Sequence, residues 1–125
     1  MLLEGNSVRS TERLLEIHRD TILKAMVRAG EKCEMFMHTT QRAIRCNDVE
    51  IDEIWGWVGM KERAKKLRRI VSEEIGDVYC FTAMERNTKL MLAFYVGSRN
   101  QDSTDRFIGN LSVAVGQGRC QYSTG

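Results

Sequence analysis

The apolar residues at the front of the chain recur with the period of a helix. From residue 6 to residue 30 they are spaced by roughly three or four positions, as in a helix that buries one face: Val8, Leu14, Leu15, Ile17, Ile22, Leu23 and Met26. A break at residues 16–18 divides this run in two. Asn6 or Ser7 can cap the first helix, and Gly30 is a suitable end for the second. We therefore predict two short helices joined by a tight turn.

The middle of the chain changes to a strand pattern. Residues 33–48 show no clear period, so we expect a connector there, with room for a short strand. Residues 49–58 are apolar on both faces, which is typical of a strand covered on both sides. Residues 77–84 and 89–97 are two further β-rich runs, and the four residues between them favour a hairpin. This region is predicted to form three strands.

The last part of the chain indicates one more helix and one more strand. Residues 100–115 have a polar start suited to capping, and Phe107, Leu111 and Ala114 share one face of the predicted helix. After a glycine-rich turn, residues 119–124 resemble a strand.

The order of these elements predicts an α/β (α+β) fold. Two helices joined by a short turn are typical of a helix-turn-helix. Three strands followed by a helix and a returning strand are how a ribonuclease-H-like domain begins. We expect a helix-turn-helix segment at residues 1–32, a connector at 33–48 and the first half of a ribonuclease-H-like domain at 49–125.

Composition excludes several classes of protein. Of the 125 residues, 42% are apolar and 29% charged, which is a folded globular balance and not a disordered one. A net charge of +2 does not by itself indicate a nucleic-acid partner. No apolar run approaches the ~18 residues of a membrane span, and the first residues are not a secretory signal. The four cysteines form no CxxC pair, so we expect buried, reduced thiols in a cytoplasmic protein.

The predicted helix-turn-helix carries side chains that suit DNA. The second helix of such a motif can lie in the major groove, where arginine, lysine and threonine contact phosphates and guanine edges. The candidate contacts on the second helix are His18, Arg19, Thr21 and Lys24. On the first helix, Arg9 and Arg13 would face the DNA backbone. Glu16 occupies the turn position where glycine is preferred because the backbone there is left-handed. A residue with a side chain in that conformation costs ~1 kcal/mol. The alternative is a plain helical hairpin with a solvated charged face.

A strongly basic run, residues 61–69, lies between the first and second predicted strands. Lys61, Lys65 and Lys66 are its candidate contacts to a phosphate backbone. The usual meaning of such a run is a solvated face, and that alternative stays open.

Three acids, Glu50, Asp52 and Glu53, lie among the apolar residues of the first predicted strand. A carboxylate in apolar surroundings is costly unless a cation pairs with it. We therefore expect one of them in a buried or cleft position, where it could bind Mg²⁺. Two-metal cleavage of a phosphate needs two or three carboxylates from different strands, so one acid supplies a ligand and not a site. The alternative is an acid on an exposed edge without a metal.

Several segments, in one order from Leu2 to Thr124, resemble transposases of the bacterial insertion element one (IS-one) family. They read LLEGNSVRSTERL, IHRDTILK, AGEKCE, VEIDEIWGWVG, DRFIGNL and GQGRCQYST. The resemblance implies a DDE transposase, with a helix-turn-helix that binds element ends and a ribonuclease-H-like domain that uses Mg²⁺ or Mn²⁺. Asp52 matches the first catalytic acid and metal ligand, while Glu53 matches its non-catalytic neighbour.

The chain departs from the family pattern beyond that first acid. The family's second acid follows the strand matching residues 119–124 in a Thr-Asp-Gly pattern, whereas this sequence reads Thr124-Gly125. The third acid has no counterpart. We therefore expect a C-terminally truncated transposase that is inactive alone and does not bind the metal tightly. The alternatives are a non-catalytic module that occupies element ends and represses transposition, or a decayed reading frame.

The expected partners follow from this interpretation. They are DNA at the ends of the element, in a bacterial, nucleoid-associated protein, and no membrane. A sheet covered by a single helix would also expose large side chains and favour self-association: Trp55, Trp57, Phe81, Phe94 and Tyr95.

Overall fold

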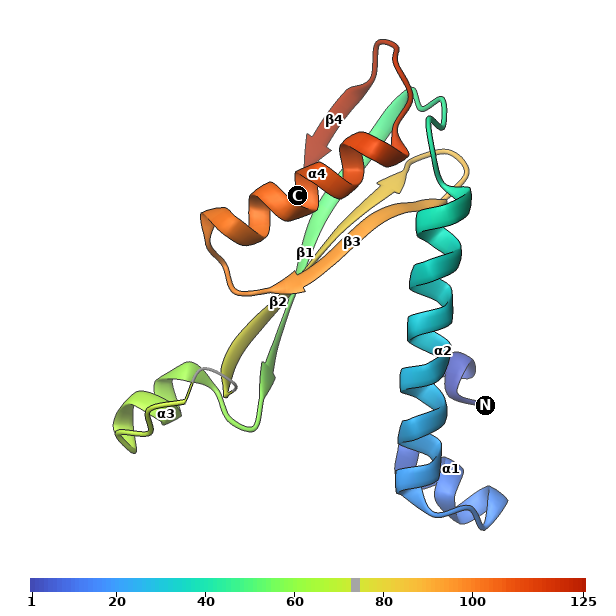
Figure 1. Cartoon of the computed structure of the whole chain (residues 1–125). Coiled ribbons are helices and arrows are strands. Elements are labelled where there is room, and N and C mark those ends of the chain that lie inside the picture. The colour runs from blue at the N-terminus through green and yellow to red at the C-terminus, as the bar shows by residue number, and fades with distance from the viewer. Residues whose placement is uncertain (73–74) are drawn as a thin grey trace. The chain divides into compact units, whose positions relative to one another are not determined.

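The computed structural model describes residues 1–72 and 75–125 and has a mixed α/β fold (Figure 1). The chain divides into two compact units, unit 1 at Met1–Thr39 and unit 2 at Thr40–Gly125. Unit 1 contains a 3-10 turn at Leu2–Glu4, helix α1 and nearly all of helix α2. Unit 2 contains a sheet with two helices.

Unit 1 begins as the sequence predicts. Helix α1 spans Val8–Leu15, and the Ser7 hydroxyl caps it by accepting a hydrogen bond from the Ser10 amide at 3.1 Å. The helix ends at Glu16, whose φ of 55° is left-handed as expected. Helix α2 then spans Arg19–Thr40. The predicted cap and the break between the helices are confirmed.

The predicted end of the second helix is wrong. Helix α2 passes through Gly30 and continues to Thr40, so residues 33–40 of the expected connector are helical. Glycine in a helix interior costs only ~1 kcal/mol, and the residues that follow it include good helix formers. His38 and Glu34 also lie one turn apart, with Nε2 and Oε1 separated by 3.9 Å. The expected boundary after residue 32 therefore falls inside α2.

Unit 2 is built on a mixed sheet with the strand order β3-β2-β1-β4. Strand β1 pairs antiparallel with β2 and parallel with β4. The four strands lie close to their predicted positions: β1 Asp48–Val58, β2 Gly76–Glu85, β3 Met91–Gly97 and β4 Gln121–Thr124. Within unit 2, the helical segment α3 at Glu62–Leu67 was not predicted and includes much of the basic run.

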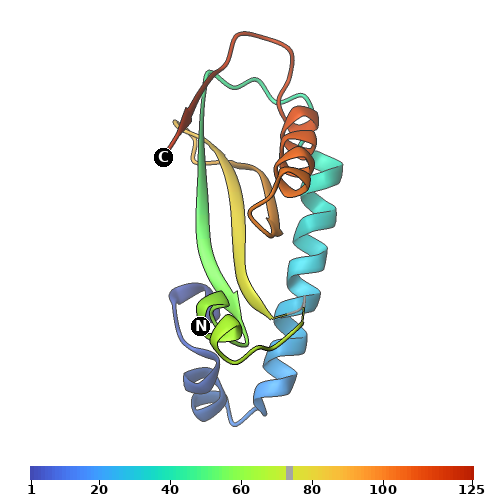
Figure 2. The same ribbon diagram turned by 90° about the vertical axis from the view of Figure 1, so that its left-hand side faces the viewer.

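Helix α4, at Gln101–Ala114, covers one face of the sheet (Figure 2). The Asn100 side chain caps it, as its polar start predicts. Phe107 of α4 packs on Phe81 of β2 with ring centroids 5.9 Å apart. A Cβ at Gly97 would lie 2.7 Å from the Ser103 hydroxyl, so the helix can approach β3 here because position 97 is glycine.

The second face of the sheet differs from the sequence-based expectation for β1. That strand was predicted to be covered on both sides, but Ile54 and Val58 are 61% and 52% exposed. The physical reason is that α4 packs only on the face that carries Val49 and Phe81. Trp55 and Trp57 are exposed, as the expectation of a partly covered sheet requires, whereas Phe81 is buried.

Candidate metal and DNA-binding sites

Asp52 lies on an inner strand of the sheet but is exposed to solvent. On β1 it is flanked by β2 and β4, and it pairs in register with Thr82. Because side chains alternate along a strand, Asp52 points to the face opposite Glu53. Its Oδ1 accepts a hydrogen bond from the Glu53 amide at 2.8 Å, and the Thr82 hydroxyl donates to its carbonyl oxygen at 3.2 Å. Asp52 is therefore not buried, but it lies on an inner strand and lines a small pocket.

The two neighbouring acids are already neutralised. Glu50 lies 3.2 Å from the Arg86 guanidinium and 3.7 Å from the Lys89 ammonium. Glu53 pairs with Arg99 at 2.8 Å. Asp52 has no ion pair in the described ranges, so of the three acids it is the one left to bind a cation.

The end of β4 lies beside Asp52. The Gly125 amide donates to the Ile51 carbonyl at 3.2 Å, which continues the parallel pairing of β4 with β1. A Cβ at position 125 would lie 3.3 Å from Oδ1 of Asp52. A small pocket of about 220 Å³ opens at this point, lined by Ile51, Asp52, Glu53, Phe81, Thr124 and Gly125. A carboxylate at position 125 would therefore face Asp52 from the adjacent strand.

Three other acids of unit 2 could in principle replace the missing family acids, but each interacts with a group of its own. Asp77 accepts a hydrogen bond from the Glu62 amide at 3.0 Å, Asp102 pairs with Arg106 at 2.9 Å, and Asp105 accepts from Gln101 at 2.7 Å. Across residues 1–72 and 75–125, no three His, Cys, Asp or Glu side chains are grouped so as to hold a metal ion. The described chain thus places one candidate ligand, Asp52, beside a position that carries a glycine.

The candidate DNA contacts of unit 1 are all exposed and lie on α1, in the turn or in the first turns of α2. His18 has a structural task, because its Nδ1 accepts a hydrogen bond from the Asp20 amide at 3.3 Å at the start of α2. Arg19 Nε lies 3.5 Å from the Asp20 carboxylate, and its amide donates to Glu12 at 2.9 Å. Asp20 therefore reduces the positive charge at this helix end. Arg19 is still 59% exposed, so it stays a candidate together with Arg9, Arg13, Thr21 and Lys24.

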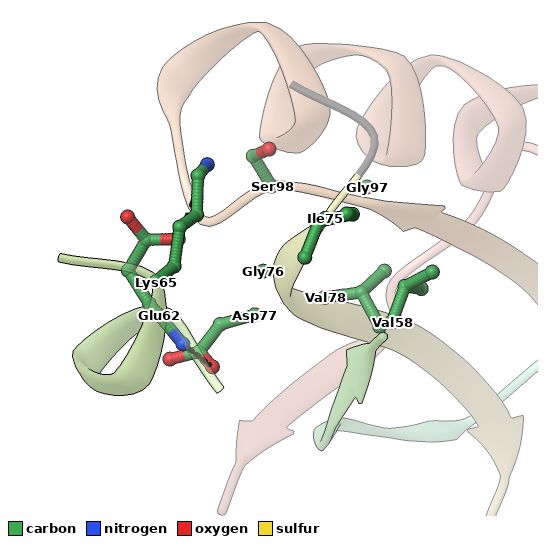
Figure 3. A pocket seen from close by; sticks show the side chains of 9 residues that line it. All are labelled: Val58, Glu62, Lys65, Ile75, Gly76, Asp77, Val78, Gly97 and Ser98. Atoms are coloured by element: carbon green, nitrogen blue, oxygen red, sulfur yellow. Dashed lines mark hydrogen bonds and ion pairs between the residues drawn. The ribbon is translucent and has the colours of Figure 1, made fainter. Parts of the chain in front are cut away.

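The three candidate lysines of the basic run differ in availability. Lys65 pairs with Glu62 at 3.6 Å and its side chain is only 17% exposed. Lys61 Nζ lies 5.0 Å from the centroid of the Trp55 ring, while Lys66 is exposed. Glu62 and Lys65 form one wall of a pocket of about 610 Å³ at the end of the β1–β2 pair (Figure 3). Lys66 is the member of this set best placed to contact a phosphate.

Sequence reasoning missed the groups that define the surroundings of Asp52. Thr82 and Arg99 reach this region only through the pairing of the strands, and no local pattern marks them, whereas the family resemblance already points to position 125. Arg99 follows β3 directly and neutralises Glu53 on β1, two strands away.

No family model, curated protein or solved structure matches this chain. No helix in the described part of the chain is both long enough and apolar enough to cross a membrane.

Proposed function

We propose that the protein is a transposase of a bacterial insertion sequence, in which unit 1 binds DNA at the element ends and unit 2 is a ribonuclease-H-like catalytic fold. The observation that carries this proposal is the position of Asp52. It lies on β1, next to the end of the parallel strand β4, and a Cβ at position 125 would lie 3.3 Å from its carboxylate. Two acids on adjacent parallel strands at this spacing could share divalent metal ions.

Asp52 would hold Mg²⁺ or Mn²⁺ through its exposed carboxylate. Such ions activate water and stabilise the attacking and leaving oxygens when a phosphodiester is cut or transferred. The pairing of Glu50 with Arg86 and Lys89, and of Glu53 with Arg99, supports this assignment because it leaves Asp52 as the available acid.

The DNA-binding part of the proposal rests on the start of α2. Arg19, Thr21 and Lys24 are exposed on its first turns, and Arg9 and Arg13 on α1 are exposed as well. A second helix that begins after a three-residue turn can present such side chains to the major groove. His18 fixes the start of that helix.

The metal site can be tested by adding the second acid. We expect Gly125→Asp to increase Mn²⁺ affinity at least tenfold, measured by calorimetry or Mn²⁺ paramagnetic resonance, because two carboxylates then face one ion. Adding Asp52→Ala to this variant should remove the gain. Gly125→Asn is the matched control, since it adds the same volume without the charge. Equal affinity of the Asp and Asn variants would refute the assignment.

A second candidate function is a non-catalytic module that occupies element ends and represses transposition. It is favoured by the glycine beside Asp52, since position 125 supplies no second carboxylate to a metal ion. On either proposal we expect the 125-residue chain alone to give no strand-transfer products with Mg²⁺. Products that disappear in Asp52→Ala would show instead that the chain is catalytic by itself.

A further inference from the structure

Both tryptophans of the chain lie on one exposed part of the sheet in unit 2. Trp55 and Trp57 are 46% and 51% exposed. They alternate along β1 and so point to the same side of the sheet, and Tyr79 of β2 pairs in register with Trp55. Helix α4 packs on the part of this side that carries Val49 and Phe81, whereas β1 and β2 extend beyond α4 toward α3 (Figure 1). We call the three rings of Trp55, Trp57 and Tyr79 the aromatic surface.

Positive side chains lie close to two of these rings. Lys61 Nζ is 5.0 Å from the centroid of the Trp55 ring, and the guanidinium carbon of Arg99 is 5.8 Å from the centroid of the Tyr79 ring. Both distances are within the ~6 Å over which a cation is attracted to an aromatic face. Lys61 is exposed and the Arg99 side chain is 68% exposed, so both charges remain accessible to a ligand.

Helix α3 adds further positive charge beside the aromatic surface. The basic run at residues 61–69 contains six basic residues and one acid, Glu62. The Glu62 amide donates a hydrogen bond to Oδ1 of Asp77 at 3.0 Å, and Asp77 pairs in register with Trp57. This hydrogen bond fixes the start of α3 next to the tryptophans.

The acids near the aromatic surface already have partners. Glu53 pairs with Arg99 at 2.8 Å, and Glu62 pairs with Lys65 at 3.6 Å. The Asp77 carboxylate accepts the hydrogen bond from α3. The remaining charges of the basic run are therefore not balanced by these acids, and the surroundings of the rings attract an anion.

The combination of exposed rings and positive charge indicates one class of ligand. Unpaired bases offer flat faces that stack on aromatic side chains, and their phosphates bind basic residues. Trp55 and Trp57 are two residues apart on a strand, which is ~7 Å. That spacing is twice the ~3.4 Å rise between neighbouring bases, so it suits one base between two rings.

We propose that the aromatic surface binds single-stranded nucleic acid, with bases stacked on Trp55 and Trp57 and phosphates bound by Lys61 and α3. This inference does not rest on the proposed function. The aromatic surface is on the side of the sheet opposite to Asp52, and all its residues belong to unit 2. Failure of duplex binding by unit 1, or of metal binding by Asp52, would leave it intact.

The direct test compares two strands of about 15 nucleotides with the full chain, oligo(dT) and an abasic strand that keeps the phosphates but lacks the bases. Fluorescence anisotropy of the labelled strands gives both affinities. We expect the abasic strand to bind about tenfold more weakly, because it cannot stack. Trp55 and Trp57 are the only tryptophans of the chain, so unlabelled oligo(dT) should also quench the tryptophan emission.

Variants of one tryptophan separate stacking from charge. Trp57→Ala should weaken the binding of oligo(dT) about tenfold and leave the binding of the abasic strand unchanged, and Trp57→Phe should restore most of the loss. Ile54→Ala is the matched control, because Ile54 is 61% exposed on the other side of the same strand. It should bind as the wild type does.

Two results with the wild-type protein would overturn the proposal. One is equal affinity for oligo(dT) and the abasic strand, which would mean that only charge is recognised. The other is tryptophan emission that changes with protein concentration and not with oligo(dT), which would assign the aromatic surface to a second copy of the chain.

Discussion

At the scale of single residues, the β2–β3 hairpin depends on one carboxylate. Glu85 is 6% exposed and accepts hydrogen bonds from the Thr88 hydroxyl at 2.7 Å and the Thr88 amide at 2.6 Å. The Asn87 amide and side chain also donate to it, at 3.1 and 3.2 Å. The Thr88 hydroxyl and amide lower the pKa of Glu85, because they stabilise its charged form. The sequence predicts a hairpin loop here but does not show that the preceding acid closes it.

Replacing this carboxylate should weaken the fold in a pH-dependent way. A lowered pKa means that the stabilisation is complete above the ordinary glutamate value of about 4.3 and is lost as the pH falls through the lower folded value. We expect Glu85→Gln to reduce the free energy of unfolding at pH 7 and to reduce the loss of stability on acidification. Urea unfolding at pH 7 and pH 3 measures both. Glu31→Gln on α2 is the exposed control, and equal behaviour of the two variants would contradict this account.

At the scale of elements, local patterns predict the strands and α4 but not the length of α2. Helix α4 has a clear period and the Asn100 cap is visible in the sequence, while β1 is marked by a run that is apolar on both faces. Gly30 reads as a helix end because glycine favours that position. Its cost is only ~1 kcal/mol, however, so ten further residues with helical propensity can extend the helix past it. Gly30 alone does not show whether its cost outweighs the helical propensity of the residues that follow it.

The packing of α4 on the sheet should dominate the stability of unit 2. Phe107 is 2% exposed and packs on Phe81. Truncation of a buried phenylalanine leaves a cavity, so we expect Phe107→Ala to lower the free energy of unfolding by about 3–5 kcal/mol. Ile108→Ala is the neighbouring control, at a side chain that is 47% exposed. Chemical denaturation followed by tryptophan fluorescence reports on unit 2 through Trp55 and Trp57, and similar losses for both variants would be inconsistent with this core.

At the scale of the whole molecule, the sequence predicts which residues belong to the candidate metal site more readily than how they come together in space. Asp52 is recognisable as an acid in an apolar strand. The sequence does not show, however, that Asp52 differs from Glu50 and Glu53 in having no ion pair. Glu50 pairs with Arg86 and Glu53 with Arg99, and both basic residues come from other parts of the sheet. The closeness of position 125 likewise depends on β4 lying parallel to β1. Such long-range register is set by the tertiary fold and leaves no local signature.

Both proposed functions require DNA binding through the start of α2, and its salt dependence is the most direct test. We would measure the affinity of the full chain for duplex DNA by fluorescence anisotropy over a range of KCl. Removal of two phosphate contacts by Arg19→Ala with Lys24→Ala should weaken binding and reduce the slope of log K against log salt by about 2. The charge-matched control, Arg106→Ala with Arg119→Ala in unit 2, should retain the wild-type slope. Equal slopes for the two double variants, or no salt-dependent binding by the wild type, would contradict the account.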